Sequence, residues 1–432
     1  MVEELKILTG YCGRYNYASV KEYVSLGGYQ GLKKALAMKP EDVINEVIVS
    51  NLMGRGGAAY PTGEKWDMIS RIDNDPKYIV CNADEGEPGT FKDKKLIYND
   101  PMKIIEGMTI AAYAISSKKG YIYIRGEYRE GYYRLKEAIR SAKAAGYLGV
   151  SILGTTLDFD IEVVSGAGAY VCGENSALCE SIEGKSGRPR LKPPYIKNVG
   201  IYGQPTLVNN VETFSCIPYI IEKGGKNYAS IGTESSAGTK LVSVSGNVKN
   251  PGVFEIPFGV TLREIVYGLA GGVEDGNVLK FVQMGGASGA CFTDSDLDTP
   301  LDYKALRSKR ISIGSGAIVV ADQTNCAVDY ALMTMEFFLH ESCGKCTPCR
   351  EGNAQLCRIL KNLVLGTANE KQVRHLENIS QLMMKASSCG LGKAAPTAVL
   401  TLYSNFKEEF LEHVEGYCRT GSCNISRKKA VV

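Results

Sequence analysis

Long apolar runs are missing from the sequence of 432 residues, in which no stretch approaches the roughly 20 residues that a membrane-spanning helix needs. The first six residues, Met1-Val2-Glu3-Glu4-Leu5-Lys6, also lack the basic and then apolar order of a secretory signal peptide. An excess of one charge is absent too, because 50 Lys and Arg stand against 47 Asp and Glu. We therefore expect a cytoplasmic protein with no membrane span and no nucleic-acid partner.

Two motifs are missing as well. The glycine-rich loop at 54–66 has no Gly-Lys-Ser/Thr tripeptide, which excludes a Walker A loop there. No C-x2-C-x2-C-x3-C-P run occurs, which excludes a two-cluster ferredoxin domain of the bacterial type. What is present is the composition of a globular chain, 44% hydrophobic and 22% charged, with room for roughly two to four structural units.

Fourteen cysteines in a chain with no export signal indicate metal ligands or thiols rather than disulfides. Cys343, Cys346 and Cys349 form a C-x2-C-x2-C triplet, and Cys389 follows in a glycine-rich turn. Three thiolates from a tight loop and one from a distant turn suit a [4Fe–4S] cluster. Zinc usually takes two separated pairs of ligands, a radical SAM enzyme uses C-x3-C-x2-C, and buried structural cysteines seldom cluster at this spacing. The sequence therefore favours an iron–sulfur cluster over these alternatives.

A second group of metal-ligand residues lies further along the chain. His413, Cys418 and Cys423 follow an H-x4-C-x4-C spacing beyond the last expected helix, and Cys326 begins the first helix of the same expected bundle. In an up-down bundle the start of the first helix and the end of the fourth share one pole, so the four side chains can converge. Three thiolates and one imidazole would make a closed structural zinc site, and the alternative is a frayed tail with free thiols.

Four glycine-rich or polar segments are candidate cofactor loops, and two of them, 80–90 and 166–178, directly follow an expected strand, which is where α/β proteins bind ligands. Successive glycines let backbone N–H groups converge on a phosphate, and paired asparagines suit the edge of a flavin. Each segment alone is a modest signal, because turns and solvated loops also explain such runs. The segments are 54–66, 80–90, 166–178 and 205–213.

The order of the expected elements predicts an α/β protein of several domains. Short apolar strands alternate with helices in the first half, which favours a largely parallel sheet. A compact ββαβ unit follows, and helical periodicity then predicts a bundle of four helices. The expected units are an N-terminal segment (1–50), an α/β domain (51–237), the ββαβ unit (238–324), the bundle (325–417) and a tail (418–432). The expected strands are 77–81, 120–125, 158–164, 240–245, 252–255 and 278–284, and the expected helices include 40–52, 130–145, 261–269, 326–342, 347–365, 369–386 and 395–415.

Five motifs occur in a fixed order: Gly-Arg-Gly-Gly-Ala (54–58), Cys-Asn-Ala-Asp-Glu-Gly-Glu-Pro-Gly (81–89), Gly-Ala-Gly-x-Tyr-x-Cys-Gly-Glu (166–174), Val-Asn-Asn-Val-Glu-Thr (208–213) and Cys-Gly-x-Cys-x-Pro-Cys (343–349). With them the chain resembles the NADH-binding flavoprotein subunit of respiratory complex I. It looks closer to the soluble NAD(P)-linked subunits of electron-bifurcating hydrogenases and formate dehydrogenases. The resemblance implies FMN in the α/β domain, a β-grasp-like (SLBB) middle domain and a helical bundle with a [4Fe–4S] cluster.

The resemblance also implies site residues, position by position. Glu87 would position the nicotinamide and Glu174 would tune its surroundings, and no side chain would act as a nucleophile. The dinucleotide would lie across Gly57, Tyr60, Glu87 and Lys192, with Tyr60 and Tyr195 stacking on adenine, although core packing also explains a lone tyrosine. FMN contacts would come from Gly54, Arg55, Gly56, Gly57, Lys65, Asn82, Asp84, Glu85, Tyr170, Gly173, Glu174, Val208, Asn209, Asn210 and Thr213.

One position departs from the family pattern, because Asn175 stands where a second glutamate is usual. In the family that glutamate faces the adenosine ribose, where a carboxylate binds the 2′-hydroxyl and repels a 2′-phosphate. A neutral Asn175, with Arg188, Arg190 and Lys192 nearby in sequence, removes that repulsion. We therefore expect NADP(H) to be tolerated or preferred over NAD(H).

Partners are implied as well. The resemblance predicts a thioredoxin-like [2Fe–2S] subunit, a larger iron–sulfur subunit of a hydrogenase, formate dehydrogenase or similar enzyme, and ferredoxin as a further partner. Neither the ferredoxin-type nor the thioredoxin-like extension of some relatives is recognised, so we expect electrons to leave through the single bundle cluster to a separate subunit. Three alternatives stay open: the NADH-binding subunit of respiratory complex I, a subunit of a membrane ferredoxin:NAD reductase, and a non-enzymatic ligand-binding module.

Overall fold

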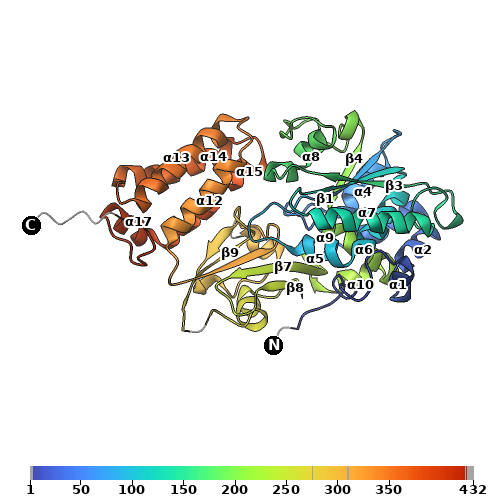
Figure 1. Ribbon diagram of the computed structural model, residues 1–432, viewed down its shortest axis with the longest axis horizontal. Coiled ribbons are helices and arrows are strands. Elements are labelled where there is room, and N and C mark those ends of the chain that lie inside the picture. Colours follow the sequence, from blue (N-terminus) through green and yellow to red (C-terminus); the bar gives the residue numbers. More distant parts are fainter. Residues whose placement is uncertain (1–2, 275, 309–310, 424, 426–432) are drawn as a thin grey trace, which may run out of the picture.

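The computed structural model of the chain describes residues 3–274, 276–308, 311–423 and 425 (Figure 1). Met1 and Val2 at the start of the chain, and 424 and 426–432 of the expected tail, lie outside the described residues. Within these described ranges, every helix is too short or too polar to cross a bilayer.

The first half of the chain forms a four-stranded sheet in the order β3-β2-β1-β4, and all three pairings are parallel. The expected strands at 77–81, 120–125 and 158–164 are confirmed, with small shifts at their ends. The strands are β1 (Tyr78–Ala83), β2 (Lys119–Ile124), β3 (Asp160–Ser165) and β4 (Thr206–Asn210). The helices of this unit are α4 (Thr62–Ser70), α5 (Lys92–Asn99), α6 (Pro101–Ile115), α7 (Arg129–Ala144), α8 (Asn175–Ile182), α9 (Val211–Lys223) and α10 (Gly225–Ala229), with single 3-10 turns η1 (Ile152–Gly154), η2 (Tyr170–Gly173) and η3 (Ile201–Gly203).

The central strand β1 is apolar on both faces, as in parallel sheets that are covered from two sides. Helices α6 and α9 pack against each other and against β1. They approach closely because a Cβ at Gly107 of α6 would lie 2.0 Å from the carbonyl oxygen of Phe214 in α9. The N-terminal helices α1 (Val20–Ser25), α2 (Gln30–Leu36) and α3 (Pro40–Val49) share this core, to which Leu32 and Val43 contribute fully buried side chains.

The middle of the chain forms a five-stranded mixed sheet in the order β10-β9-β11-β7-β8. The three expected strands are confirmed, whereas β10 and β11 extend the unit beyond the expected ββαβ pattern. The helix expected at 261–269 is present as a single π-helical segment. The elements are β7 (Thr239–Gly246), β8 (Gly252–Pro257), η4 (Glu264–Leu269), β9 (Leu279–Met284), β10 (Ala290–Phe292), η5 (Asp294–Asp296), α11 (Tyr303–Ser308) and β11 (Ala317–Asp322), preceded by the hairpin β5 (Gly232–Thr233) and β6 (Ser236–Ala237).

The last part is the helical bundle, on the left of Figure 1. Its first three expected helices are confirmed, but the helix expected over 395–415 is wrong as a single element. The chain leaves the helical conformation at Phe406 (φ −129°, ψ 36°), which divides it into two shorter helices. The helices are α12 (Ala327–Glu341), α13 (Thr347–Val364), α14 (Glu370–Ala386), α15 (Gly390–Ala394), α16 (Thr397–Asn405) and α17 (Lys407–Val414).

Buried ion pairs connect the first two units. Lys92 of α5 and Lys240 of β7 bind the same carboxylate, that of Glu212 in α9, at 2.9 and 2.6 Å. Lys92 also pairs with Asp93 at 2.6 Å, and all four side chains are buried. Two lysines and two carboxylates therefore balance each other in an interior that would not tolerate an unpaired charge.

Candidate active site

A cavity of about 480 Å³ opens where the α/β unit, the mixed sheet and the bundle meet. It lies beyond the carboxyl end of β1, the usual place for ligands in such sheets. Ten of the residues predicted from the sequence line it: Gly56, Gly57, Asn82, Asp84, Glu85, Glu87, Tyr170, Gly173, Glu174 and Asn210. The other predicted residues do not line it: Gly54, Arg55, Tyr60, Lys65, Asn175, Lys192, Tyr195, Val208, Asn209 and Thr213.

Several of the second group support the cavity wall from behind. The guanidinium of Arg55 is fully buried and donates to the Tyr228 hydroxyl at 3.0 Å and the Ala237 carbonyl at 2.7 Å, away from the cavity. Its backbone N–H donates to the Thr213 hydroxyl at 2.9 Å, which holds the glycine loop in place. The Lys65 ammonium donates to the Val208 carbonyl at 2.9 Å, and burial lowers the pKa of Lys65 to about 8.

Tyr60 and Tyr195, predicted to stack on adenine, are both exposed. The Lys65 ammonium lies 5.7 Å from the centre of the Tyr60 ring. An exposed aromatic ring has an apolar face that a planar base can cover, and core packing does not account for either residue.

Two buried oxygen atoms at or beside the cavity have no hydrogen-bond partner within the described part of the chain, Asp84 Oδ2 and Asn209 Oδ1. Burial raises the pKa of Asp84 to about 7. Because buried polar atoms are nearly always paired, these acceptors indicate a ligand with hydroxyl or N–H groups. The ribityl chain and ring edge of a flavin supply such groups, so the residues present fit FMN.

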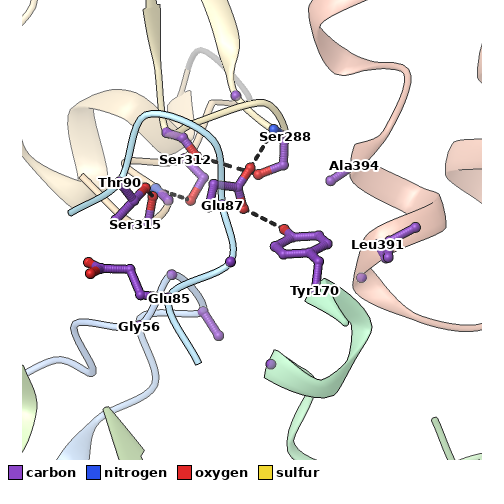
Figure 2. Close-up of a pocket in the computed structure, with 18 of the residues that line it drawn as sticks. Gly56, Glu85, Glu87, Thr90, Tyr170, Ser288, Ser312, Ser315, Leu391 and Ala394 are labelled. Carbon is purple, nitrogen blue, oxygen red and sulfur yellow. Dashed lines mark hydrogen bonds between the residues drawn. The ribbon is translucent and has the colours of Figure 1, made fainter. Parts of the chain in front are cut away.

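Glu87 is the acidic residue at the centre of the cavity (Figure 2). One carboxylate oxygen accepts the Ser288 backbone N–H at 2.8 Å, and the other accepts the Tyr170 hydroxyl. Burial raises the pKa of Glu87, while these two donors act in the opposite direction. Figure 2 shows Glu85 with its side chain turned away from Glu87. Its carboxylate accepts the N–H groups of Asp93 and Lys94 at the start of α5, at 2.8 and 2.9 Å.

Glu174 caps the N-terminus of α8. One of its oxygens accepts the N–H groups of Ser176 and Ala177 at 2.9 and 3.0 Å, and the other binds the Lys192 ammonium at 2.9 Å. Burial acts against ionisation, but Lys192 and the cap bonds hold the pKa of Glu174 below its usual range. Asn175 is the first residue of the helix. Lys192, one of the three cations predicted near Asn175, is thus engaged by Glu174.

The sequence interpretation missed two walls of the cavity. One consists of two glycine- and serine-rich loops of the mixed sheet, represented by Ser288, Ser312 and Ser315, and the other is the start of the bundle turn at Gly390 and Leu391. Figure 2 shows Leu391 and Ala394 on the side of the cavity next to Tyr170. The Gly285-Gly286-Ala287-Ser288-Gly289 run was the available signal, since such runs allow a backbone to approach a ligand closely.

The four predicted cluster ligands come together at the edge of this cavity. Cys343 and Cys346 lie between α12 and α13, Cys349 lies in the first turn of α13, and Cys389 directly precedes α15. Burial raises the pKa of Cys349, and the charges of the other three cysteines act in the same direction. A Cβ at Gly392 would lie 2.8 Å from that of Cys349, which brings the distant turn against the triplet loop. The residues present therefore fit a [4Fe–4S] cluster.

Two further side chains contact the sulfur of Cys349. The Ser342 hydroxyl lies 3.3 Å away, and the side-chain amide nitrogen of the fully buried Asn353 lies 3.4 Å away. The loop is also tied to the α/β unit, because the Lys345 ammonium donates to the Pro189 carbonyl at 2.8 Å.

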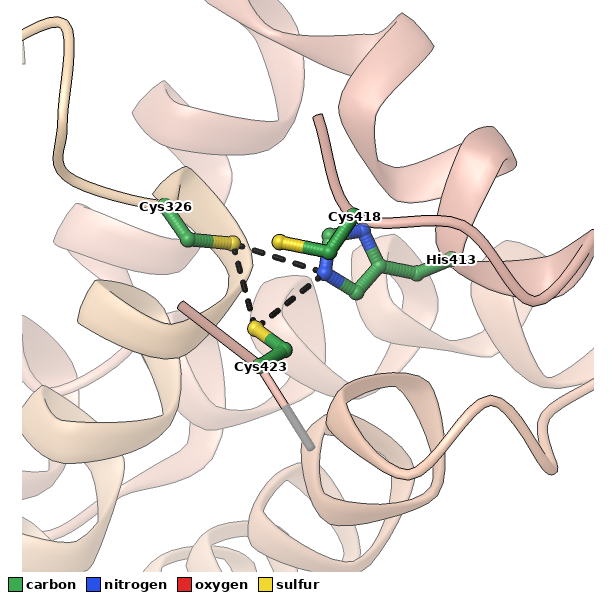
Figure 3. A group of neighbouring side chains, drawn as sticks. All are labelled: Cys326, His413, Cys418 and Cys423. Carbon is green, nitrogen blue, oxygen red and sulfur yellow. Dashed lines mark hydrogen bonds between the residues drawn. The ribbon is translucent and has the colours of Figure 1, made fainter. Parts of the chain in front are cut away.

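The second predicted metal group converges as well (Figure 3). The ligand atoms of Cys326, His413, Cys418 and Cys423 all lie within 4.8 Å of one another. His413 Nε2 is 3.4 Å from the sulfurs of Cys326 and Cys423, and these sulfurs are 3.6 Å apart. A tetrahedral zinc site has ligand–ligand distances of roughly 3.6–3.8 Å, from bond lengths of about 2.0–2.3 Å.

The surroundings of His413 fix its orientation. Its Nδ1–H donates to the Glu409 carbonyl at 2.6 Å, which leaves Nε2 as the free acceptor that faces the sulfurs. A hydrogen bond from Cys423 lowers the pKa of Cys326, despite its burial. A thiolate and an oriented imidazole are the protonation states in which these residues bind a metal.

Comparison with known proteins assigns families to all three units. Residues 47–219 match the Nuo51 FMN-binding domain, and residues 241–291 match the SLBB domain. Residues 329–413 match the NADH-ubiquinone oxidoreductase-F iron-sulfur binding region, which includes the four predicted cluster ligands. The resemblance inferred from the five motifs is confirmed in each unit.

Similar proteins cover nearly the whole chain. The NADP-reducing hydrogenase subunit HndC of Solidesulfovibrio fructosivorans is 43% identical over 96% of this chain and 84% of its own. A subunit of the NADH-quinone oxidoreductase of Aquifex aeolicus, the one designated F, is 46% identical over 91% of this chain and 90% of its own.

A solved structure is similar as well. The crystal structure of NAD+-reducing [NiFe]-hydrogenase in the H2-reduced state superposes with a TM-score of 0.80 at 36% identity, over 88% of this chain. The chain spans only 64% of that hydrogenase chain. With whole-length relatives at this identity, the chain belongs to the oxidoreductase family that comprises the flavin- and iron–sulfur-binding subunits of NADH-quinone oxidoreductases and of related hydrogenases.

Proposed function

We propose that this chain is the diaphorase subunit of a larger iron–sulfur oxidoreductase, in which NADP(H) or NAD(H) exchanges electrons with FMN and a [4Fe–4S] cluster. When bound, FMN supplies two-electron exchange with the nicotinamide and one-electron exchange with the cluster. The observation that carries the proposal is the position of Gly390 and Leu391. Both line the cavity, and they directly follow the predicted cluster ligand Cys389.

The chain's own residues have positioning roles in this proposal. The glycine loop at Gly56 and Gly57 lets the backbone approach the flavin phosphate, and Asp84 and Asn209 offer acceptors to its polar edge. Glu87 presents a fixed carboxylate to the nicotinamide end. Walls from all three units line the cavity.

An anaerobic absorption spectrum of the purified chain tests the proposal. We expect flavin peaks on a broad cluster absorption, with about one FMN and four irons per chain, and bleaching of both on addition of NADPH or NADH. A colourless protein, or one with iron but no flavin, would contradict the proposal and favour a ligand-binding module.

NADP(H) is the proposed preferred dinucleotide. Asn175 begins α8 beside the Glu174–Lys192 pair, so one carboxylate at this end is already bound to an ammonium and no second carboxylate follows it. Arg190 is held by Glu180 and by Glu183 at 3.2 Å, and Lys192 by Glu174 at 2.9 Å, which leaves the exposed Arg188 as the cation for a 2′-phosphate. The relatives include both NADP and NADH enzymes and do not decide the choice.

The substitution Asn175→Glu tests the dinucleotide preference. A carboxylate at this position repels a 2′-phosphate, so we expect kcat/KM for NADPH to fall by roughly tenfold or more, about 1.4 kcal/mol. The value for NADH should stay the same or rise. Both are measured with an artificial electron acceptor. A strong NADH preference of the parent protein would end the NADP proposal and leave the diaphorase proposal intact.

We also propose that separate partner chains accept the electrons. A thioredoxin-like [2Fe–2S] subunit and a larger iron–sulfur subunit of a hydrogenase or formate dehydrogenase would take the electrons, in the cytoplasm, and electron bifurcation with ferredoxin would require both. The alternative is the NADH-binding subunit of respiratory complex I. Isolation of the native complex and identification of its other chains decides between these, because a membrane arm is present only in the alternative.

We also propose that Cys326, His413, Cys418 and Cys423 hold a structural zinc ion. The donor set, the distances and the Nδ1–H bond of His413 support this assignment. Metal analysis should find about one zinc per chain in addition to iron. Cys418→Ser should lose the zinc and keep the iron, whereas Cys357→Ser, which removes another buried thiol of the bundle, should keep both. A parent protein that contains only iron would refute the assignment.

A further inference from the structure

The carboxylate of Glu87 is held by two units at once (Figure 2). Tyr170 belongs to the α/β unit and donates to one oxygen, while the Ser288 N–H of the SLBB domain donates to the other at 2.8 Å. Both donors are neutral, and among the described residues no lysine, arginine or histidine pairs with Glu87. Neutral donors orient a carboxylate without cancelling its charge, so that charge still faces the cavity.

The SLBB loop is shaped around the Glu87 side chain. Gly286 has a φ of +81°, and a Cβ at this position would lie 2.1 Å from Glu87 Cγ. The backbone therefore rests directly on the stem of Glu87, in a conformation that only glycine adopts without strain. An alanine here must push the Glu87 side chain away, because the rest of the loop is fixed by its own close contacts, such as that of Gly289 with the Met284 carbonyl.

The loop that carries Glu87 also contacts this domain through residues 89–91. The Thr90 and Ser315 hydroxyls are 2.6 Å apart, and the Phe91 N–H donates to the Ser243 hydroxyl at 3.0 Å. A Cβ at Gly89 would lie 2.8 Å from the Val319 side chain. The contact between Ser288 and Glu87 is therefore the end of a continuous docking surface rather than an isolated bond.

We propose that the SLBB loop 285–289 is a positioning element of the active site, which holds the Glu87 carboxylate, through Ser288 N–H and Gly286, against the carboxamide-bearing end of the dinucleotide. The inference rests on the proposed function for the role of Glu87. It extends the site to the SLBB domain, which the proposed function alone gives no part in the reaction. In this proposal Ser288 and Gly286 act through Glu87.

The substitution Gly286→Ala tests the proposal, with Gly276→Ala as its matched control. Gly276 lies in the same domain at a φ of +82°, but a Cβ there would meet nothing within 4 Å. Both variants carry the same backbone strain, and only Gly286→Ala displaces Glu87. We expect normal FMN and iron contents in both, and for Gly286→Ala a raised KM and a kcat/KM lowered by about 10- to 100-fold. Equal kinetics in the two variants would overturn the proposal.

A double variant separates positioning from a general structural effect. Once Glu87→Ala has removed the side chain, Gly286→Ala has nothing left to displace, so the double variant should match Glu87→Ala within about twofold. Additive losses would show that the loop acts in another way and would overturn the proposal. If Gly286→Ala does not fold, Ser288→Pro, which lacks the N–H, is compared with Ser288→Ala, which keeps it. The proline variant should show the larger defect, because Ser288→Ala removes only the hydroxyl next to Glu87 and keeps the N–H, and equal kinetics would again overturn the proposal.

The two proposals fail in different ways. A parent protein without flavin contradicts the proposed function, whereas a flavin-loaded parent whose Gly286→Ala variant behaves like Gly276→Ala contradicts only the positioning role.

Discussion

Hydrogen bonds to Cys349 set the electrostatics of the proposed cluster. The Ser342 hydroxyl and the Asn353 amide both contact its sulfur, and such donors stabilise the reduced, more negative cluster. We predict that Ser342→Ala lowers the reduction potential of the cluster and that Asn353→Leu lowers it as well. Redox titration followed by electron paramagnetic resonance measures the shift. Ser380→Ala, which removes a buried bundle hydroxyl that has no hydrogen-bond partner among the described residues, should leave the potential unchanged.

Asp84 makes the stability of the flavin-free protein depend on pH. Burial raises its pKa from an ordinary value near 4 to about 7, so the folded state keeps the proton longer than the unfolded chain. Its contribution to the free energy of unfolding is therefore full below pH 4 and is lost as the pH rises toward 7. We predict that Asp84→Asn raises the urea midpoint at pH 8 more than at pH 5. Asp73→Asn, which changes an exposed carboxylate, should keep the pH dependence of the parent.

Some residues of the candidate site could be predicted from the sequence and others could not. The cluster cysteines were accessible because their type and spacing carry chemical meaning, and Glu87 because it lies in a motif of the family that the chain resembles. Asn353 and Ser342 were not, because a polar residue within a helical stretch carries no sign of what it faces. Arg55 belongs to a motif, yet its side chain points into the protein, since a motif preserves supporting residues as well as contacting ones.

At the scale of elements, the ion pairs between α5, α9 and β7 hold the first two units together. Glu212→Leu leaves the ammonium groups of Lys92 and Lys240 buried with one carboxylate fewer, so we predict a loss of about 3–5 kcal/mol in the free energy of unfolding. Adding Lys240→Met should recover part of this loss. Urea unfolding measures both. Glu137→Gln, in an exposed pair on α7, should change stability little, and a similarly small effect of Glu212→Leu would contradict the prediction.

Most elements followed from hydrophobic pattern alone. Strands of the parallel sheet are nearly continuous apolar runs, so β1, β2 and β3 were placed to within a few residues. The break at Phe406 was not visible, because the apolar periodicity continues across it and only tertiary packing ends the helix. The strands β10 and β11 were missed because β10 is only three residues long, and β11 pairs with distant strands that local sequence cannot indicate.

At the scale of the whole molecule, the proposed zinc site connects segments from two units. Cys326 directly precedes α12, and Glu409, whose carbonyl orients His413, also pairs with Lys280 of β9 at 2.7 Å. We predict that removal of zinc with a chelator lowers the thermal midpoint and exposes the chain after α17 to protease, with flavin and iron contents unchanged. Re-addition of zinc should restore the midpoint of the parent and leave that of Cys418→Ser unaltered. An unchanged thermal midpoint after complete zinc removal would contradict a stabilising role of the zinc ion.

Three units of the chain each contribute a wall to the cavity. The cavity is therefore complete only when all three units have folded and packed together. A newly made chain in which one piece is still unfolded has no place for a reactive flavin next to a cluster. With FMN and the cluster bound as proposed, such a chain would lack the complete path for electrons, so we expect electron transfer to begin only after the last unit has packed.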